Sequence, residues 1–358
     1  MLALGNPEHR CSKAVSTRFS DLPGESSEVQ NLGGSGLLRR FLSLRTLLSF
    51  VVAAGLLALS WVLAGLRIED IVAHLGAANP LLIVVAYAVF ALTFPVRTFR
   101  WRLMLINVAH REPVAPNYRA RDLFQILYIS WFVNGVVPAK LGDIYRAYMA
   151  RANYGTSLTR TLGTIFSERV LDVGTLTAMV LVSAGFIVSS PETSDDAGRI
   201  LAIAAIGLGL LVIGVFFLLL FGKPIVRLFP QRASRVYERF HSGVFDSWTW
   251  RTGPWLWLAS VLVWSLEMLR LALVMRGLGV IMDPPQIVFV GTAASLLLAV
   301  PTPGGLGAVE SGILGLTRMI GVGAGLAGAV VLVDRVITYW SVLVTGGLLF
   351  VFTKLKRQ

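Results

Sequence analysis

The two halves of the chain carry the same short pattern. In the first half, Pro138-Ala-Lys-Leu-Gly142 interrupts an apolar run, and Glu168-Arg169 follows inside the next apolar segment. In the second half, Pro303-Gly-Gly-Leu-Gly307 interrupts an apolar run, and Asp334-Arg335 follows at nearly the same spacing. In a membrane protein, broken helices and intramembrane charges at matching positions of two repeats indicate a binding site between the repeats. The pattern therefore favours the handling of a lipid or solute over simple anchoring.

The composition is that of a polytopic membrane protein. Hydrophobic residues make up 55% of the 358 residues and only 15% are charged, against about a quarter in a soluble domain. The net charge of +12 fits cytoplasmic loops that face anionic lipid, so it requires no nucleic-acid partner. A single cysteine, Cys11, and four histidines without a His-x-x-x-His pair argue against a metal site. We therefore expect neither a metal nor a cofactor.

Hydropathy divides the chain into two tails and a membrane domain. Residues 1–37 are polar and are predicted to form a disordered cytoplasmic tail, and 353–358 a short basic one. The part between them, 38–352, is predicted to form the transmembrane domain. Full spans are predicted at 46–66, 81–97, 161–188, 200–222, 254–276 and 322–351. Two further apolar stretches, 122–150 and 286–318, contain the Pro/Gly patterns and are too broken for one helix each.

The distribution of Lys and Arg predicts how these segments are arranged. Basic residues cluster before the first span, in 97–121, in 223–251 and at the C-terminus, which places both termini and both loops in the cytoplasm. These assignments agree only if each interrupted stretch is a re-entrant hairpin, the first entering from the cytoplasm and the second from outside. The halves, 44–190 and 199–352, then form an inverted repeat. The expected fold is all-α, with about six full transmembrane helices and two oppositely oriented hairpins.

The second interruption combines three glycines with an acid. Gly304, Gly305 and Gly307 allow backbone conformations that other residues avoid, and they let a ligand approach closely. A helix that begins after them, with Glu310 in its first turn, would point its amides into the membrane interior and favour an anionic group such as phosphate. A tight structural turn explains the same glycines equally well.

The first interruption carries charge. Lys140 and Arg146 are candidates for attracting a head group, and Asp143 for orienting them. The alternative is a local ion pair between Asp143 and Arg146, which lie three residues apart on the expected helix. Lys140 has no obvious partner nearby in the sequence.

Charged residues inside the spans need partners in the protein interior. Each costs roughly 2.5–3.5 kcal/mol on insertion scales. We assign Arg169 and Arg335 as anion ligands, with Glu168 and Asp334 as the acids that orient them and Tyr339 one turn further on. A structural cluster of salt bridges that ties the two repeats together is the alternative.

Two other groups of charges receive structural interpretations. Arg97, Arg100 and Arg102, with Trp101, are predicted to form an aromatic and basic belt at the cytoplasmic interface, and phospholipid capture is the alternative. Glu267 and Arg270 lie three residues apart, and we expect them to form a bridge of their own.

Together, these residues resemble the flippase-like family, also called the lysylphosphatidylglycerol synthase transmembrane-region family. The resemblance rests on Asn134, Pro138, Gly142-Asp143, Arg146 and Glu168-Arg169, and on Pro303-Gly-Gly-Leu-Gly307, Glu310, Asp334-Arg335 and Tyr339. It covers residues 40–352 and implies a protein of the prokaryotic inner (plasma) membrane that flips lipid. Bifunctional members add a soluble domain that aminoacylates phosphatidylglycerol. That half is expected to be absent, because the chain stops at Gln358 after the last span.

The leading hypothesis is a lipid transporter that binds an anionic phospholipid or polyprenyl phosphate between the two hairpins. The alternative is a non-transporting partner or scaffold for a separate glycosyltransferase or lipid synthase. An intramembrane lipid-modifying enzyme is the third candidate and would use Glu168 or Glu310. The sequence shows no dinucleotide fingerprint and no defensible Ser–His–Asp set, so we expect no enzymatic activity.

Overall fold

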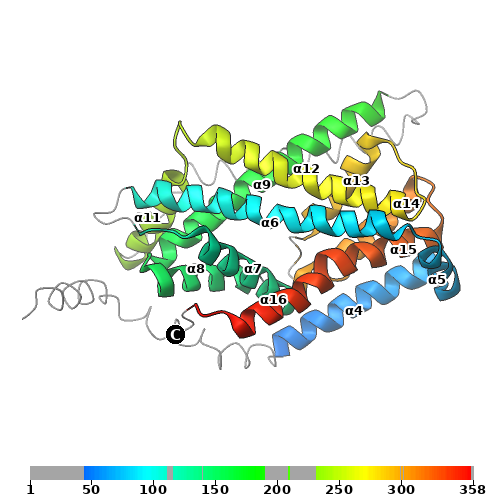
Figure 1. Cartoon of the computed structure of the whole chain (residues 1–358), viewed down its shortest axis with the longest axis horizontal. Coiled ribbons are helices and arrows are strands. Elements are labelled where there is room, and N and C mark those ends of the chain that lie inside the picture. The colour runs from blue at the N-terminus through cyan, green and yellow to red at the C-terminus, as the bar shows by residue number, and fades with distance from the viewer. Residues whose placement is uncertain are drawn as a thin grey trace, which may run out of the picture.

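Our computed structural model describes residues 44–110, 116–138, 140–189, 209, 231–298, 300 and 302–355. Every regular element in these residues is helical, which confirms the all-α class (Figure 1). The elements are α4 (Leu44–Ala64), α5 (Ile68–Gly76), α6 (Pro80–Ala109), α7 (Ala120–Val136), α8 (Leu141–Tyr154), α9 (Leu158–Val188), α11 (Gln231–Asp246), α12 (Gly253–Gly277), α13 (Pro284–Leu297), the 3-10 turn η1 (Pro303–Gly305), α14 (Ala308–Met319), α15 (Ala324–Arg335), the π-helical turn η2 (Val336–Trp340) and α16 (Ser341–Phe352).

Four described helices are long and apolar enough to cross a membrane. They are α6, α9, α12 and the run from α15 through η2 to α16, and they correspond to four of the predicted spans. A fifth is reached if α4 and α5 are one span, although their axes are bent by 88°. The predicted span at 200–222 and the predicted tail at 1–37 lie outside the described residues.

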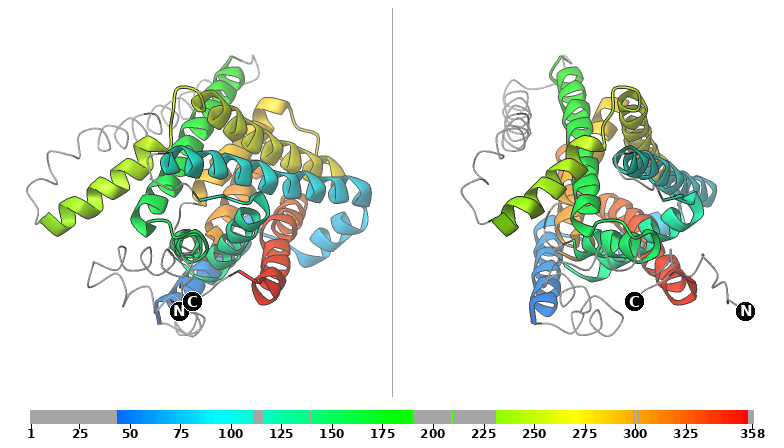
Figure 2. Two further views of the ribbon diagram at one scale, coloured as in Figure 1. Left: turned by 60° about the vertical axis from the view of Figure 1, so that its left-hand side comes forward. Right: turned by 90° about the vertical axis from the view of Figure 1, so that its left-hand side faces the viewer.

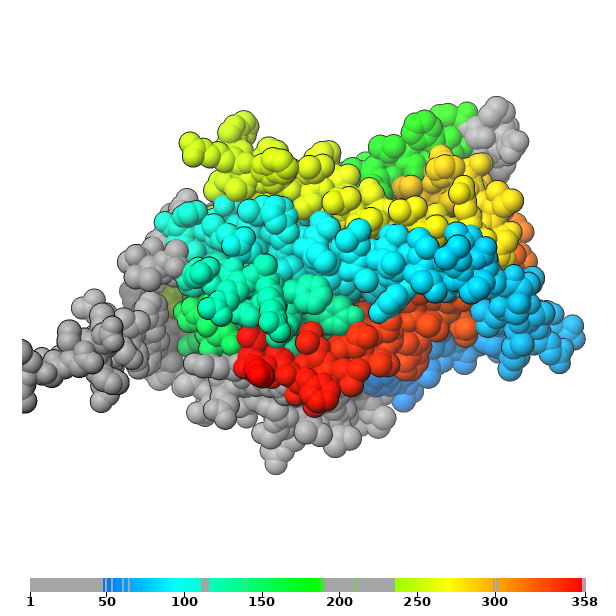
Figure 3. Space-filling view, viewed as in Figure 1, coloured from blue at the N-terminus to red at the C-terminus, as the bar shows by residue number. Residues whose placement is uncertain are grey.

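Helix α6 is longer than the sequence predicts. It begins at Pro80, where the side chain of Asn79 accepts hydrogen bonds from the amides of Leu81 and Leu82. It then runs for 30 residues, with Pro95 inside it. At about 1.5 Å per residue this helix exceeds the ~30 Å hydrocarbon core. Figure 3 shows α6 (cyan) beside α12 (yellow) across one face of the molecule.

Helices α7 and α8 form an antiparallel pair. At the break between them, the amide of Gly142 donates to the Asn134 side-chain oxygen at 2.8 Å. At the far ends, the Tyr154 hydroxyl donates to Asp122 at 3.1 Å and accepts from the amide of Arg119 at 3.3 Å. Burial, together with the charge of Asp122, raises the pKa of Tyr154 to about 12, so the hydroxyl keeps its proton. The pair therefore starts and finishes at the same end of the bundle.

The loops of the described chain gather at two opposite ends. At the end that holds Tyr154, hydrogen bonds join Asn107 to Ser247 at 2.8 Å and Thr353 to Gln125 at 2.8 Å. At the other end, the amide of Asn79 donates to the carbonyl of Gly277 at 2.7 Å. The start of α15 also packs on α5 there. The stretch α13–η1–α14, which lies between Gly277 and α15, therefore leaves and returns at this second end.

Two glycines let α11 lie closely against α9. A Cβ added to Gly243 would lie 2.1 Å from the Arg160 carbonyl oxygen, and one added to Gly163 would lie 2.4 Å from the Phe240 carbonyl oxygen. Figure 2 shows α11 (lime) crossing α9 (green) and extending away from the rest of the bundle. The contact is thus between backbones, and any larger residue must push the helices apart.

We therefore expect Gly243→Ala to loosen α11 from α9. The backbone atoms in the way cannot rotate aside as a side-chain end can. Limited trypsin digestion should cleave at Arg239 several-fold faster than in the wild type. Gly185→Ala is the control, because no atom lies within 4 Å of a Cβ added there. Equal cleavage rates in Gly243→Ala and wild type would contradict the close packing.

Candidate functional site

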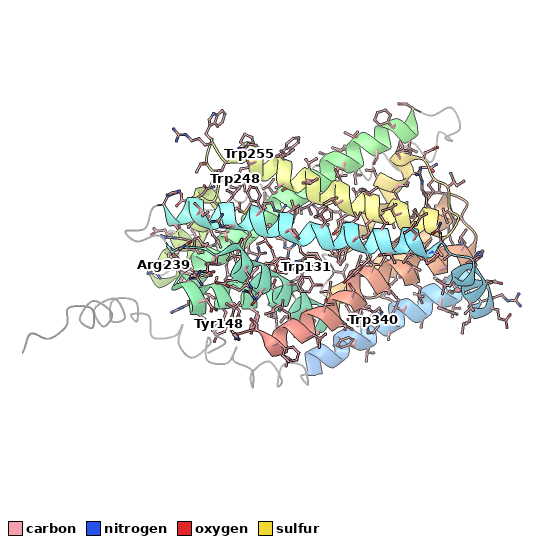
Figure 4. The ribbon with its side chains drawn as sticks, viewed as in Figure 1. Trp131, Tyr148, Arg239, Trp248, Trp255 and Trp340 are labelled. Atoms are coloured by element: carbon pink, nitrogen blue, oxygen red, sulfur yellow. The ribbon has the colours of Figure 1, made fainter. Side chains whose placement is uncertain are left out.

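A cavity of about 160 Å³ lies where the two helix interruptions meet. Residues of α6, α7, α9, α12, α13, α14 and α15–α16 line it, together with η1 and the α7–α8 break. Figure 4 shows Trp131, one of the lining residues, in the middle of the bundle, whereas the exposed Trp255 and Trp340 lie nearer its outside. The ionisable lining residues are Arg97, Lys140, Arg169, Glu267, Arg270, Asp334 and Arg335. A pocket lined by apolar and aromatic side chains with a few converging polar groups is the usual form of a ligand site.

Tyr339 holds the two interruptions together. Its hydroxyl donates to the carbonyl of Gly135, at the end of α7, at 2.9 Å. Its ring lies against Gly304, where an added Cβ would come within 2.5 Å of a ring carbon. Tyr339 belongs to the π-helical turn η2, a distortion that is frequent at functional sites. The sequence places Tyr339 beside the charges, and the structure shows that it contacts both breaks.

The second interruption has the backbone that its glycines predict. The φ angles of Gly304, Gly305 and Gly307 are 58°, 71° and 84°. The amide of Gly307, however, donates to the Glu310 carboxylate at 2.7 Å. The other oxygen of Glu310 forms an ion pair with the Arg335 guanidinium at 2.8 Å. Glu310 therefore accepts the hydrogen bond that this helix N-terminus was expected to donate to a phosphate.

The first interruption is tied to α9. Asp143 pairs with Arg169 at 3.1 Å, and Arg146 pairs with Glu168 at 3.0 Å. Asn134, which caps the break, also donates to Asp143 at 3.1 Å. The prediction of a local ion pair between Asp143 and Arg146 is therefore wrong, because each residue pairs with a different residue of α9. The expected pairing of Arg169 with Glu168 is wrong for the same reason.

Two arginines of α6 lie in the centre of the protein. The Arg100 side chain is 0% exposed and pairs with Glu168 at 2.8 Å and Asp172 at 2.6 Å. Arg97 pairs with Glu267 at 3.1 Å, and its guanidinium lies 4.8 Å from the centre of the Trp131 ring. The prediction of an interfacial belt is therefore wrong for both residues. The acids of α9 and α12 hold them inside the bundle.

A chain of ion pairs continues across α12 to α15. The predicted bridge between Glu267 and Arg270 is confirmed at 3.1 Å. Arg270 pairs on its other side with Asp334. Asp334 thus faces α12, and its expected role as the partner of Arg335 is wrong. The ion pairs join α6, α12 and α15 around the cavity.

The comparison with known sequences agrees with this architecture. The family model for the lysylphosphatidylglycerol synthase TM region matches residues 46–346. This chain belongs to the lysylphosphatidylglycerol synthase transmembrane-region family. It is 30% identical over 224 residues to the UPF0104 membrane protein MJ1078 of Methanocaldococcus jannaschii, across 61% of this chain and 93% of the relative. It is 29% identical over 244 residues to Glycosyltransferase AglD of Haloferax volcanii, across 60% of this chain and 38% of AglD.

Among the residues that the structure describes, cations exceed carboxylates by one around the cavity of this family member. The seven cations are Arg97, Arg100, Lys140, Arg146, Arg169, Arg270 and Arg335. The six carboxylates are Asp143, Glu168, Asp172, Glu267, Glu310 and Asp334. Each of these carboxylates pairs with an arginine, so none is a free base. The described residues contain no group of three or more His, Cys, Asp or Glu that could hold a metal ion.

Proposed function

We propose that this chain moves lipid across the membrane and that the central cavity binds an anionic lipid head group. The observation that carries the proposal is a cavity lined by cations at the contact between two helix breaks. Such breaks at the centre of a transporter commonly surround the substrate. The cations favour phosphate over a neutral solute. Anionic phospholipid and polyprenyl phosphate are the cargo classes, and the prokaryotic plasma membrane is the proposed location.

The proposed topology has α7–α8 and α13–η1–α14 as re-entrant hairpins that enter from opposite sides. Support comes from the hydrogen bonds that gather the ends of α7 and α8 at one end of the bundle, and from the packing of α15 on α5 at the other. The halves would then be an inverted repeat with both termini in the cytoplasm, and rocking of one half against the other would alternate access.

In this scheme, Arg169 and Arg335 are the anion ligands, and each can exchange a carboxylate for a phosphate. Arg169 is held by Asp143, and Arg335 by Glu310. The Arg169 side chain is 31% exposed, so it can reach an occupant of the cavity. A guanidinium binds phosphate with the same parallel geometry with which it binds a carboxylate. Arg97, Arg100 and Arg146 are more deeply buried, and in this scheme they stabilise the fold through their ion pairs.

Filling the cavity should stop transport. Ser295 lines the cavity on α13, and Ser295→Phe places a ring in the space proposed for the head group. In proteoliposomes with labelled phosphatidylglycerol, phosphatidylethanolamine or polyprenyl phosphate, we expect at least a tenfold loss of translocation. Ser265→Phe is the matched control, because Ser265 is exposed on α12. Wild-type translocation by a correctly folded Ser295→Phe protein would refute the cavity route.

The second candidate is a non-transporting partner of a separate glycosyltransferase. It is favoured by the similarity to AglD, which is named a glycosyltransferase and of which the match covers 38%. This candidate predicts co-purification of a glycosyltransferase with the wild-type protein and no translocation of any of the three lipids. Transport by the purified protein alone would reject it.

A further inference from the structure

Lys140 differs from every other cation of the site. No carboxylate lies within 4.0 Å of its ammonium group among the described residues, whereas each of the six arginines has at least one. Its side chain lines the cavity beside Arg169. Its backbone is also unusual, because φ is 54°, the only positive value among the described non-glycine residues. Strained backbone of this kind concentrates at functional sites.

The left-handed backbone at Lys140 has a local cause. Lys140 is the residue that precedes α8. Two residues later, Gly142 lies so close to α7 that an added Cβ would be 2.1 Å from the Ser130 carbonyl oxygen. The sharp turn that this contact requires places Lys140 at the cavity wall. A charged side chain is therefore held in a strained position in which no described carboxylate forms a direct ion pair with it.

The charge of the site follows from this count. In the described part of the chain, six arginines and six carboxylates cancel, and Lys140 leaves one positive charge. An uncompensated charge in a low-dielectric interior is unfavourable until a counter-charge arrives. A ligand with one negative charge neutralises the site, whereas a ligand with two leaves the site with a net negative charge. An added ammonium group would find no free carboxylate there among the described residues.

We propose that the site selects a monoanionic phosphodiester head group whose phosphate pairs with Lys140 beside Arg169. This inference rests on the proposed function and names its substrate class. A phosphatidylglycerol-type lipid brings one negative charge. A zwitterionic head group brings an extra ammonium, and a lysyl ester of the same lipid is cationic overall. The lysyl lipid in the family's name is therefore disfavoured by this chain. A doubly charged phosphomonoester is disfavoured too, so of the two proposed cargo classes the inference selects anionic phospholipid over polyprenyl phosphate.

The test is a competition for the full-length protein in detergent, read by native mass spectrometry. Equal amounts of phosphatidylglycerol, its lysyl ester, phosphatidylethanolamine and phosphatidic acid are offered together. We expect wild type to bind phosphatidylglycerol at least tenfold over each competitor. Lys140→Gln should lose this preference, and Lys140→Arg should keep most of it. Lys354→Gln, at an exposed lysine after the last helix, is the matched control and should behave as wild type.

A second variant changes the charge in the opposite direction. Asp143→Asn removes a carboxylate beside Lys140 and Arg169 and leaves the site with two positive charges. We expect its preference to move several-fold towards phosphatidic acid, which carries more negative charge. An unchanged preference in both Lys140→Gln and Asp143→Asn would overturn the inference, even if either variant were less stable than wild type.

The binding result and the transport result separate the two proposals. Translocation of phosphatidylglycerol and phosphatidylethanolamine at equal rates, without selective binding, would overturn the head-group selectivity and leave the transport function standing. Selective, Lys140-dependent binding without translocation would support the selectivity and reject transport. Selective binding together with selective translocation supports both.

Discussion

Arg100→Ala should prevent the protein from accumulating in its folded form. The Arg100 side chain is fully buried, and its removal leaves Arg146 as the one arginine paired with Glu168. Asp172 keeps a hydrogen bond from the Trp264 indole at 3.1 Å, but its nearest remaining cation is Arg169 at 3.9 Å. Breaking a buried ion pair by removing one partner costs about 3–5 kcal/mol. That is a large part of the 5–15 kcal/mol by which a typical protein is stable. Size-exclusion profiles and Tm of purified protein would measure the loss.

Arg276→Ala is the control for this experiment. Arg276 lies in the last turn of α12, the same helix that supplies Glu267, but its side chain is exposed. Substitution of an exposed arginine should change the stability by less than about 0.5 kcal/mol. A Tm for Arg100→Ala equal to that of Arg276→Ala would show that the buried network does not hold the helices together.

Gly142→Ala should open the α7–α8 pair and abolish the function of the site. The added Cβ would lie 2.1 Å from the Ser130 carbonyl oxygen and 2.6 Å from the Asn134 side-chain oxygen. Since α8 cannot keep its position, Asn134 loses its hydrogen bond to residue 142, and Asp143 moves away from Arg169. We expect more than a tenfold loss of lipid binding and transport, with a Tm lower by several degrees.

Gly174→Ala in α9 controls for the substitution itself. No atom lies within 4 Å of a Cβ added at Gly174, and alanine favours helix more than glycine does. This variant should transport as wild type and be at least as stable. Wild-type binding by Gly142→Ala would mean that the close approach of α8 to α7 is not required.

The helical fold and the two helix interruptions could be predicted from local sequence signals. The Pro/Gly patterns identify both interruptions, and the glycines of the second one have the positive φ angles that their residue type allows. Four predicted spans coincide with long apolar helices. The re-entrance of the two hairpins and the inverted repeat stay predictions, because they concern the position of the chain in a membrane.

The pairing of the charges could not be predicted, because it depends on which helices are neighbours. Neighbours in sequence, such as Glu168 and Arg169, point to different faces of one helix, so each finds its partner elsewhere. The sequence places Arg97 and Arg100 in an interfacial belt because basic residues commonly end a span. A useful signal was available: the two arginines lie three residues apart, and a mostly apolar stretch, broken by Arg102 and Asn107, continues after them to Ala109.

Photo-cross-linking would test most directly whether the cavity holds the lipid head group. Phosphatidylglycerol with a photoreactive head group would be added to the full-length protein in liposomes, and labelled peptides would be mapped by mass spectrometry. We predict labels on the cavity residues of α7, α13 and α15–α16 that disappear in Ser295→Phe and persist in Ser265→Phe. Labels confined to exposed outer helices, unchanged by Ser295→Phe, would contradict the account.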